Sequence, residues 1–65
     1  MKHYYFIENE SGEEFIVGAN SLNEAWEIAR DVAHSIEEYE EIQSDLSFEY
    51  EMTEEEAENS GLDEY

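Results

Sequence analysis

Residues 21–40 read SLNEAWEIARDVAHSIEEYE, and this stretch decides the fold. Its apolar side chains recur three or four positions apart, at Leu22, Ala25, Trp26, Ala29, Val32, Ala33, Ile36 and Tyr39, with Ile28 on the flank. This spacing places them on one wide face of a helix over residues 22–40. Ser21 and Glu24 fit a capping box, in which each side chain accepts from the other residue's amide. A single helix with this face is expected to cover a sheet.

Three β-rich stretches surround the helix. Residues 3–8 (HYYFIE) and 14–19 (EFIVGA) flank a segment whose Asn9 and Gly12 favour a turn. In residues 45–52 apolar and polar side chains alternate, so one side of this strand should be buried and the other solvated. The predicted fold is an α+β, two-layer ββαβ domain over residues 1–52, with one helix on a three-stranded, mainly antiparallel sheet. We favour the first strand at the centre, although a right-handed crossover placing the third strand beside the second stays open.

Residues 53–65 form an acidic tail. Thr53 and Glu56 fit a second capping box, so a short helix is predicted to run to about Asn59, where Ser60 and Gly61 would end it. Disorder is the alternative, because the segment is highly charged.

Charge is the most unusual property of the chain. Asp and Glu number 20 against two Lys and Arg, which gives a net charge of −18. A small domain needs a net magnitude of only about 2 to 8 for solubility, and like charges on one helix face are destabilising. Phosphate contacts are made mainly by Lys and Arg, so direct nucleic-acid binding is not expected, and the favoured partner is a basic protein. Adaptation to a salt-rich cell is the alternative explanation of the acidity.

Residues that support catalysis are scarce. The chain has no cysteine, two histidines (His3 and His34) and no glycine-rich phosphate loop, so it is predicted not to be an enzyme and to need no cofactor. The acids near the turn lack the spacing of a calcium loop, so no dedicated metal site is expected. No segment approaches the roughly 20 apolar residues of a membrane span. The polar start at Met1 and the lack of cysteine favour the cytoplasm of a bacterial cell.

The candidate binding residues are acids that project from the helix and the third strand. Acids four positions apart on a helix lie about 6 Å apart along its axis, comparable to successive phosphates of a nucleic acid. The set comprises Glu24, Glu27, Asp31, Glu37, Glu38, Glu41, Glu49 and Glu51. Tyr4 completes it, because a tyrosine among carboxylates can seat an arginine of the partner. Further acids around the hairpin (Glu8, Glu10, Glu13 and Glu14) and in the tail should extend the negative field.

Both faces of the predicted hairpin are apolar, while one helix can cover only one of them. Tyr5 and Ile7 alternate with Tyr4 and Phe6, so some aromatic surface should remain exposed. The tail could fold over that surface, or two chains could form a homodimer through it.

Small size, extreme acidity and outward rows of carboxylates resemble the DNA-mimic proteins of phages and mobile elements. This resemblance implies inhibition of a nuclease or another basic nucleic-acid-binding protein, of the anti-restriction or anti-CRISPR type. The hairpin followed by Ser21-Leu22-Asn23-Glu24-Ala25 and a third strand also looks like the short ββαβ domains of the DpnD/PcfM type, from which no functional residue can be transferred. Two alternatives stay open: an immunity or antitoxin protein for a cognate nuclease, and an accessory domain that assembles through an aromatic sheet face.

Overall fold

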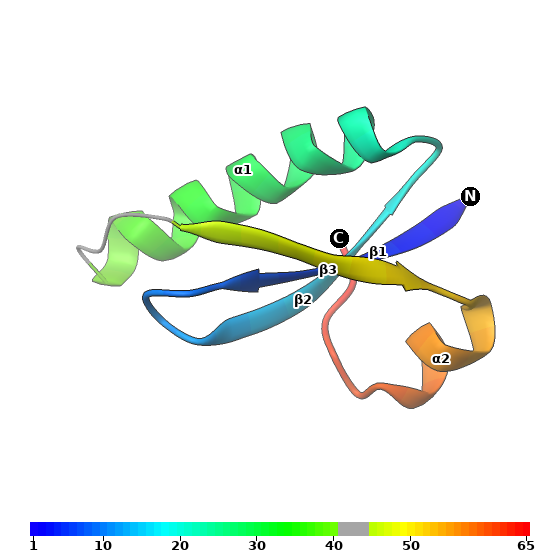
Figure 1. Cartoon of the computed structure of the whole chain (residues 1–65). Helices are drawn as coiled ribbons and strands as arrows, with labels where there is room; N and C mark the ends of the chain where they lie inside the picture. The colour runs from blue at the N-terminus through cyan, green and yellow to red at the C-terminus, as the bar shows by residue number, and fades with distance from the viewer. Residues whose placement is uncertain (41–44) are drawn as a thin grey trace.

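The computed structural model describes residues 1–40 and 45–65, with the backbone alone for residues 35–40 (Figure 1). The elements are β1 (Lys2–Glu8), β2 (Glu13–Ala19), α1 (Leu22–Glu40), β3 (Leu46–Met52) and α2 (Glu54–Asn59). The sheet has the order β2-β1-β3, and both pairs of strands are antiparallel. Helix α1 lies across one face of the sheet and α2 lies on the opposite side (Figure 1). The predicted α+β domain with a central first strand is therefore confirmed.

The core between α1 and the sheet is built around Phe6. Its ring lies 4.9 Å from Trp26, 5.6 Å from Phe48 and 5.9 Å from Phe15, measured between ring centroids. Ala25 and Ala29 are fully buried on the helix face, and their small side chains let α1 approach these rings closely. Full burial of a phenylalanine side chain such as that of Phe6 contributes about 1.5–3 kcal/mol to the free energy of folding. Phe6 thus joins α1 to all three strands.

Strand β3 changes face halfway along its length. Phe48 is opposite Phe6, but Tyr50 is opposite Tyr5, so the ladder contains a β-bulge with one extra residue in β3 at Glu49. Leu46 and Phe48 consequently pack under α1, whereas Met52 joins a cluster on the other face. The predicted continuous alternation of β3 is wrong beyond Phe48, because one inserted residue reverses the side on which every later side chain lies.

The tail is folded in the structure. The Thr53 side chain accepts from the Glu56 amide, and the Glu56 side chain accepts from the Thr53 amide, so the predicted capping box is present. Gly61 follows the C-cap with φ 74°, a conformation that favours glycine. Ala57 packs against Ile16 and Met52 on the face of the sheet opposite α1. Of the two possibilities for this segment, the structure has the short helix.

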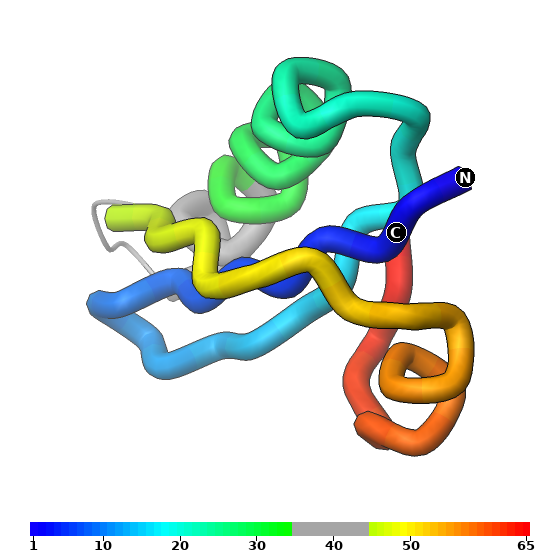
Figure 2. The backbone as a smooth tube through the Cα atoms, turned by 45° about the vertical axis from the view of Figure 1, so that its right-hand side comes forward, coloured from blue at the N-terminus to red at the C-terminus, as the bar shows by residue number. Residues whose placement is uncertain are grey.

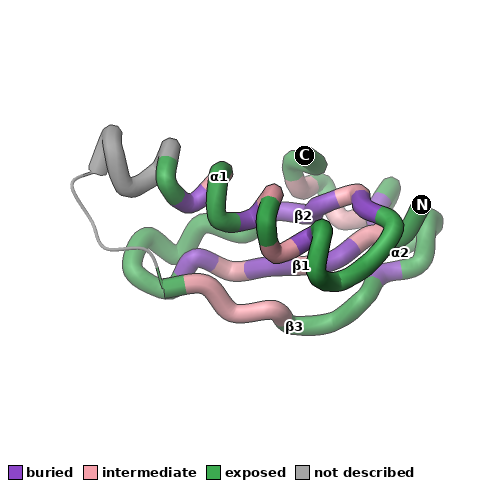
Figure 3. The backbone as a smooth tube through the Cα atoms, turned by 90° about the horizontal axis from the view of Figure 1, so that it is seen from above, coloured by how far each residue is buried: buried purple, intermediate pink, exposed green. Residues whose placement is uncertain are grey.

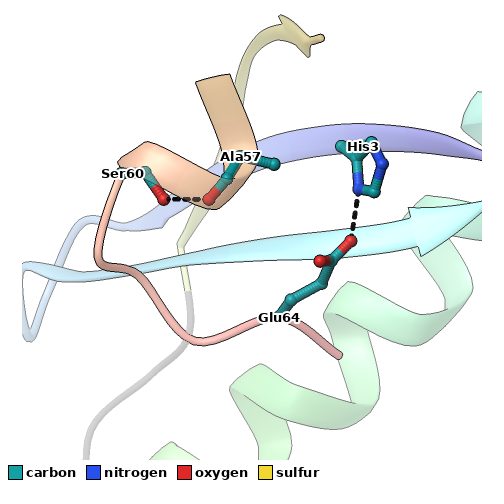
Figure 4. A network of polar contacts seen from close by, with 4 residues as sticks. All are labelled: His3, Ala57, Ser60 and Glu64. Atoms are coloured by element: carbon teal, nitrogen blue, oxygen red, sulfur yellow. Dashed lines mark hydrogen bonds and ion pairs between the residues drawn. The ribbon is translucent and has the colours of Figure 1, made fainter. Parts of the chain in front are cut away.

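The last three residues close the outer edge of β2. Asp63 and Tyr65 accept from the amides of Ile16 and Gly18 at 2.9 Å, and the Tyr65 amide donates to the Ile16 carbonyl at 2.8 Å. This short segment runs parallel to β2. The Glu64 carboxylate also meets the His3 ring across the sheet, and Ser60 holds the end of α2 through the Ala57 carbonyl (Figure 4). One edge of the sheet is therefore covered by the chain itself.

Deleting residues 63–65 should destabilise the domain, because it removes three backbone hydrogen bonds and the contact of the Tyr65 ring with Phe15. We expect a loss of about 1–3 kcal/mol in the free energy of unfolding, measured by urea denaturation at high salt, where charge repulsion is screened. The control is Tyr65→Ala, which keeps the backbone bonds and should lose less. An unchanged urea midpoint after the deletion would show that the segment does not stabilise the edge.

Candidate acidic interface

The outward face of α1 carries a row of three exposed acids. With 3.6 residues per turn, Glu24, Glu27 and Asp31 fall within about 60° of one another around the helix axis, nearly opposite the buried Ala25 and Ala29. Ser21 positions the start of this row, because its Oγ accepts from the Glu24 amide at 3.2 Å. The packing of the alanine face against the sheet therefore points these carboxylates into solvent.

The other predicted acids of this helix are less fully described. Glu37 and Glu38 lie within α1, where the structure describes the backbone alone. Glu41 lies outside the described residues. The described acids of the candidate interface on α1 therefore lie in the first half of this helix.

Arg30 flanks the acidic row. Its guanidinium carbon lies 5.8 Å from the centroid of the Trp26 ring, a cation–π arrangement. Together with Asn23 and Glu27, these two residues line a shallow, open depression on the helix surface. One positive charge therefore borders the row of acids beside Glu27.

Glu49 and Glu51 are both exposed on β3, as the predicted interface requires, although they do not share a face. Glu51 is opposite Tyr4, whose side chain points toward α1, whereas Glu49 lies at the bulge and its charge acts on Tyr5, on the opposite face. Both reach solvent because β3 is an edge strand and is exposed from Glu49 to Glu51, before the buried Met52 (Figure 3). The two carboxylates therefore border the edge of the sheet from different sides.

Tyr4 is not part of this surface. It is 4% exposed and lies in the core, with its ring 5.9 Å from that of Phe48. The tyrosines of the sheet that reach the surface are Tyr5, which is partly buried, and Tyr50, which is 48% exposed. Both faces of the hairpin are apolar in the sequence, so alternation alone could not show which one α1 covers. Tyr50 was missed because the bulge that turns it away from the core has no sequence signal.

Tyr5 and Tyr50 form a small aromatic site with nearby acids on the face opposite α1. Their rings meet edge to face, with centroids 5.3 Å apart and an interplanar angle of 78°. The Tyr5 hydroxyl donates to the Glu14 carboxylate. This hydrogen bond, with burial and the negative charges of Glu14 and Glu49, raises the pKa of Tyr5 to about 12. The site therefore combines aromatic edges with negative charge.

Replacing Glu14 with Gln should bring the pKa of Tyr5 back toward its ordinary value of 10.0, because the variant removes the charge that opposes the phenolate. An NMR titration of the Tyr5 ring carbons would measure this shift. Glu13→Gln is the matched control, since Glu13 is exposed in the same strand. Equal Tyr5 titrations in the two variants would contradict the assigned contact.

Glu8 belongs to the interior and not to the acidic surface. It is fully buried, and its carboxylate accepts from the amides of Ser11 at 2.7 Å and Asp45 at 2.6 Å. Burial acts to raise the pKa of Glu8, but these amide donors outweigh it and the pKa is lowered overall. Asn9 completes the link by donating to Asp45 and Ser47, at 2.8 Å in each case. One ionised carboxylate thus ties the β1–β2 turn to the start of β3.

Glu8→Gln should destabilise the domain by about 1–3 kcal/mol at neutral pH, because the single oxygen of the Gln side chain can accept from only one of the two amides and its NH2 group would face the other. Since the folded-state pKa is below the ordinary 4.5, the contribution of Glu8 is present above pH 4.5 and is lost as the pH falls through the lower folded value. Urea denaturation of both proteins across this range would measure the difference.

The matched control for this series is Glu10→Gln, an exposed acid of the same turn that should have little effect. A gap between the Glu8 variant and the parent protein that stayed constant down to pH 2 would contradict the role of the ionised carboxylate.

Among residues 1–40 and 45–65, apart from the side chains of 35–40, no group of three or more His, Asp or Glu is arranged to hold a metal ion. Within the same part of the chain, no helix has the length and apolar character needed to cross a membrane. Two candidate binding surfaces are therefore the acidic row of α1 and the edge of β3, where Tyr50 lies against Tyr5 of β1.

Comparison with known proteins found no matching family model, no matching curated protein and no matching solved structure.

Proposed function

We propose that this chain is an acidic nucleic-acid mimic that binds a basic nucleic-acid-binding protein or nuclease and excludes nucleic acid from its channel. The observation that carries this proposal is the match in linear charge density. The chain holds 18 net negative charges over a longest dimension of 33 Å, about one charge per 1.8 Å. B-form DNA carries one charge per about 1.7 Å of helix axis. A basic channel that accommodates a DNA duplex would therefore meet about the same negative charge on this chain as on a DNA segment of equal length.

The acids are also held on a rigid support. The row on α1 stands on a helix whose other face is locked against aromatic rings, and the acids of β3 stand on a paired strand. Binding therefore requires little loss of conformational entropy to order these carboxylates, whereas a disordered acidic tail would have to be ordered when it binds. The field should also accelerate association, with a rate that falls steeply as salt is added.

The two alternative functions fare differently. An immunity protein for one cognate nuclease is a narrower form of the same proposal, because its contact would be equally electrostatic. A homodimer through the aromatic sheet face would have less exposed apolar surface to bury, because Ala57 of α2 and Leu62 of the tail already cover part of that face.

The first test is competition with DNA. The immobilised chain should capture nucleic-acid-binding proteins from bacterial lysate at low salt and release them when either salt or duplex DNA is added. Mass spectrometry of the proteins eluted by DNA identifies the partner, and a DNA cleavage or DNA-binding assay on the purified partner then measures inhibition. Capture of no such protein, or capture that neither salt nor DNA reverses, would overturn the proposal.

The second test maps the surface. The triple variant Glu24→Lys, Glu27→Lys and Asp31→Lys should weaken inhibition of the captured partner by at least about tenfold, because it reverses the row on α1. The control is Glu54→Lys, Glu55→Lys and Glu58→Lys, which makes the same change in net charge at exposed positions of α2. An equal effect of the two variants would show that net charge alone matters, and inhibition unchanged in the first would place the interface elsewhere.

A further inference from the structure

The two edges of the sheet are treated differently by the chain. Residues 63–65 pair with β2 on one side, whereas none of the described residues pairs with the outer edge of β3 on the other (Figure 2). An unpaired edge presents a row of backbone donors and acceptors to which another strand can bind. The β3 edge is therefore a place where a partner could extend the sheet.

The register shows which backbone groups are available there. The amides of Ile16 and Gly18 point to the tail, so the residues between them point to β1. Continuing this alternation across β1, the backbone groups of His3 and Tyr5 point to β3, where their partners are Met52 and Tyr50. Glu51 lies between those partners, and its N–H and C=O consequently point outward.

Phe48 also presents its backbone groups outward. It is opposite Phe6, whose own backbone groups point to β2 by the same alternation. Leu46, opposite Glu8, follows the same rule, so the edge offers Leu46 and Phe48 on one side of the bulge at Glu49 and Glu51 on the other.

The side chains along this edge select the strand that can bind. Glu49 and Glu51 are exposed, and Tyr50 between them is 48% exposed with its ring against Tyr5. Pairing of two copies through β3 would bring like charges together, which is destabilising across a sheet. A strand rich in Arg or Lys would instead place cations beside these carboxylates and against the tyrosine rings.

We propose that the outer edge of β3 binds an extended, cationic segment of the partner protein as a fourth strand, with Glu49, Tyr50 and Glu51 contacting its Arg or Lys side chains. This inference rests on the proposed function, because it takes the partner to be basic, and it specifies how part of that partner is held. Backbone pairing supplies contacts that are less sensitive to salt than the acidic row of α1, and the flanking charges supply the selectivity.

The test uses the full chain and a defined probe, the capped octapeptide of alternating Arg and Val. The control peptide has the same sequence but is methylated on every backbone nitrogen, so it keeps the charge and loses its strand-forming donors. The unmodified peptide should bind at least about tenfold more tightly, as two to three net hydrogen bonds would give. Calorimetry at low and high salt measures both affinities.

Amide hydrogen exchange of the labelled protein, read by NMR, locates the contact. The outward amides of Phe48 and Glu51 should exchange fast in the free chain and slow by at least about tenfold with the unmodified peptide, because exchange requires an open donor. The amides of Tyr50 and Met52, which face β1, serve as internal controls and should change little. Glu51→Pro should weaken peptide binding more than Glu51→Gln, since only the former lacks the outward N–H.

The outcomes separate this inference from the function on which it rests. Equal binding of both peptides, lost in salt and without protection of Phe48 or Glu51, would overturn strand pairing and leave the acidic mimic in place. No binding of either peptide at low salt would count against both. A concentration-dependent dimer that protects the same amides would show that the edge binds a second copy, which contradicts the proposed occupant. The peptide comparison decides even if Glu51→Pro does not fold.

Discussion

The packing of Phe6 between the sheet and α1 is the contact on which the rest of the structure depends. A chain of 65 residues with a net charge of −18 must offset strong mutual repulsion with a small core. Aromatic rings supply more buried area per residue than aliphatic side chains, and those around Phe6 come from both neighbouring strands and the helix. Burial of these rings stabilises the fold against the repulsion between the carboxylates at its surface.

Glu8 shows the opposite use of the same residue type. In a chain with so many carboxylates at the surface, this one is buried and satisfied by backbone amides of the β1–β2 turn and the start of β3. The Glu8 carboxylate joins segments that lie 37 residues apart in the sequence. An ionised group can remain in the interior because the charge-assisted hydrogen bonds replace its hydration. Acidity in this protein therefore serves both the surface and the scaffold that displays it.

The functional proposals combine two kinds of surface. The row of acids on α1 and the overall charge density suit a groove that accepts nucleic acid. The β3 edge adds backbone groups and two tyrosines, which give direction and geometry to a contact that charge alone would leave loosely defined. Because the tail closes the other edge, only one side of the sheet among the described residues offers this kind of contact.

The sequence by itself determined the order of elements, both helix starts and the acidic row of α1, because periodicity and capping are local properties. It favoured an antiparallel sheet with the first strand at the centre, but it left a crossover beside the second strand open, because strand order depends on contacts between distant segments. Tertiary structure decided the rest. Helix α1 covers one face of the hairpin, and this choice places Tyr4 in the core and Tyr5 near the surface. The bulge at Glu49 turns Tyr50 to the face opposite α1. The burial of Glu8 and the closure of the β2 edge also depend on contacts between distant segments. Such contacts follow from how strands pair and pack in space, and no local pattern encodes them.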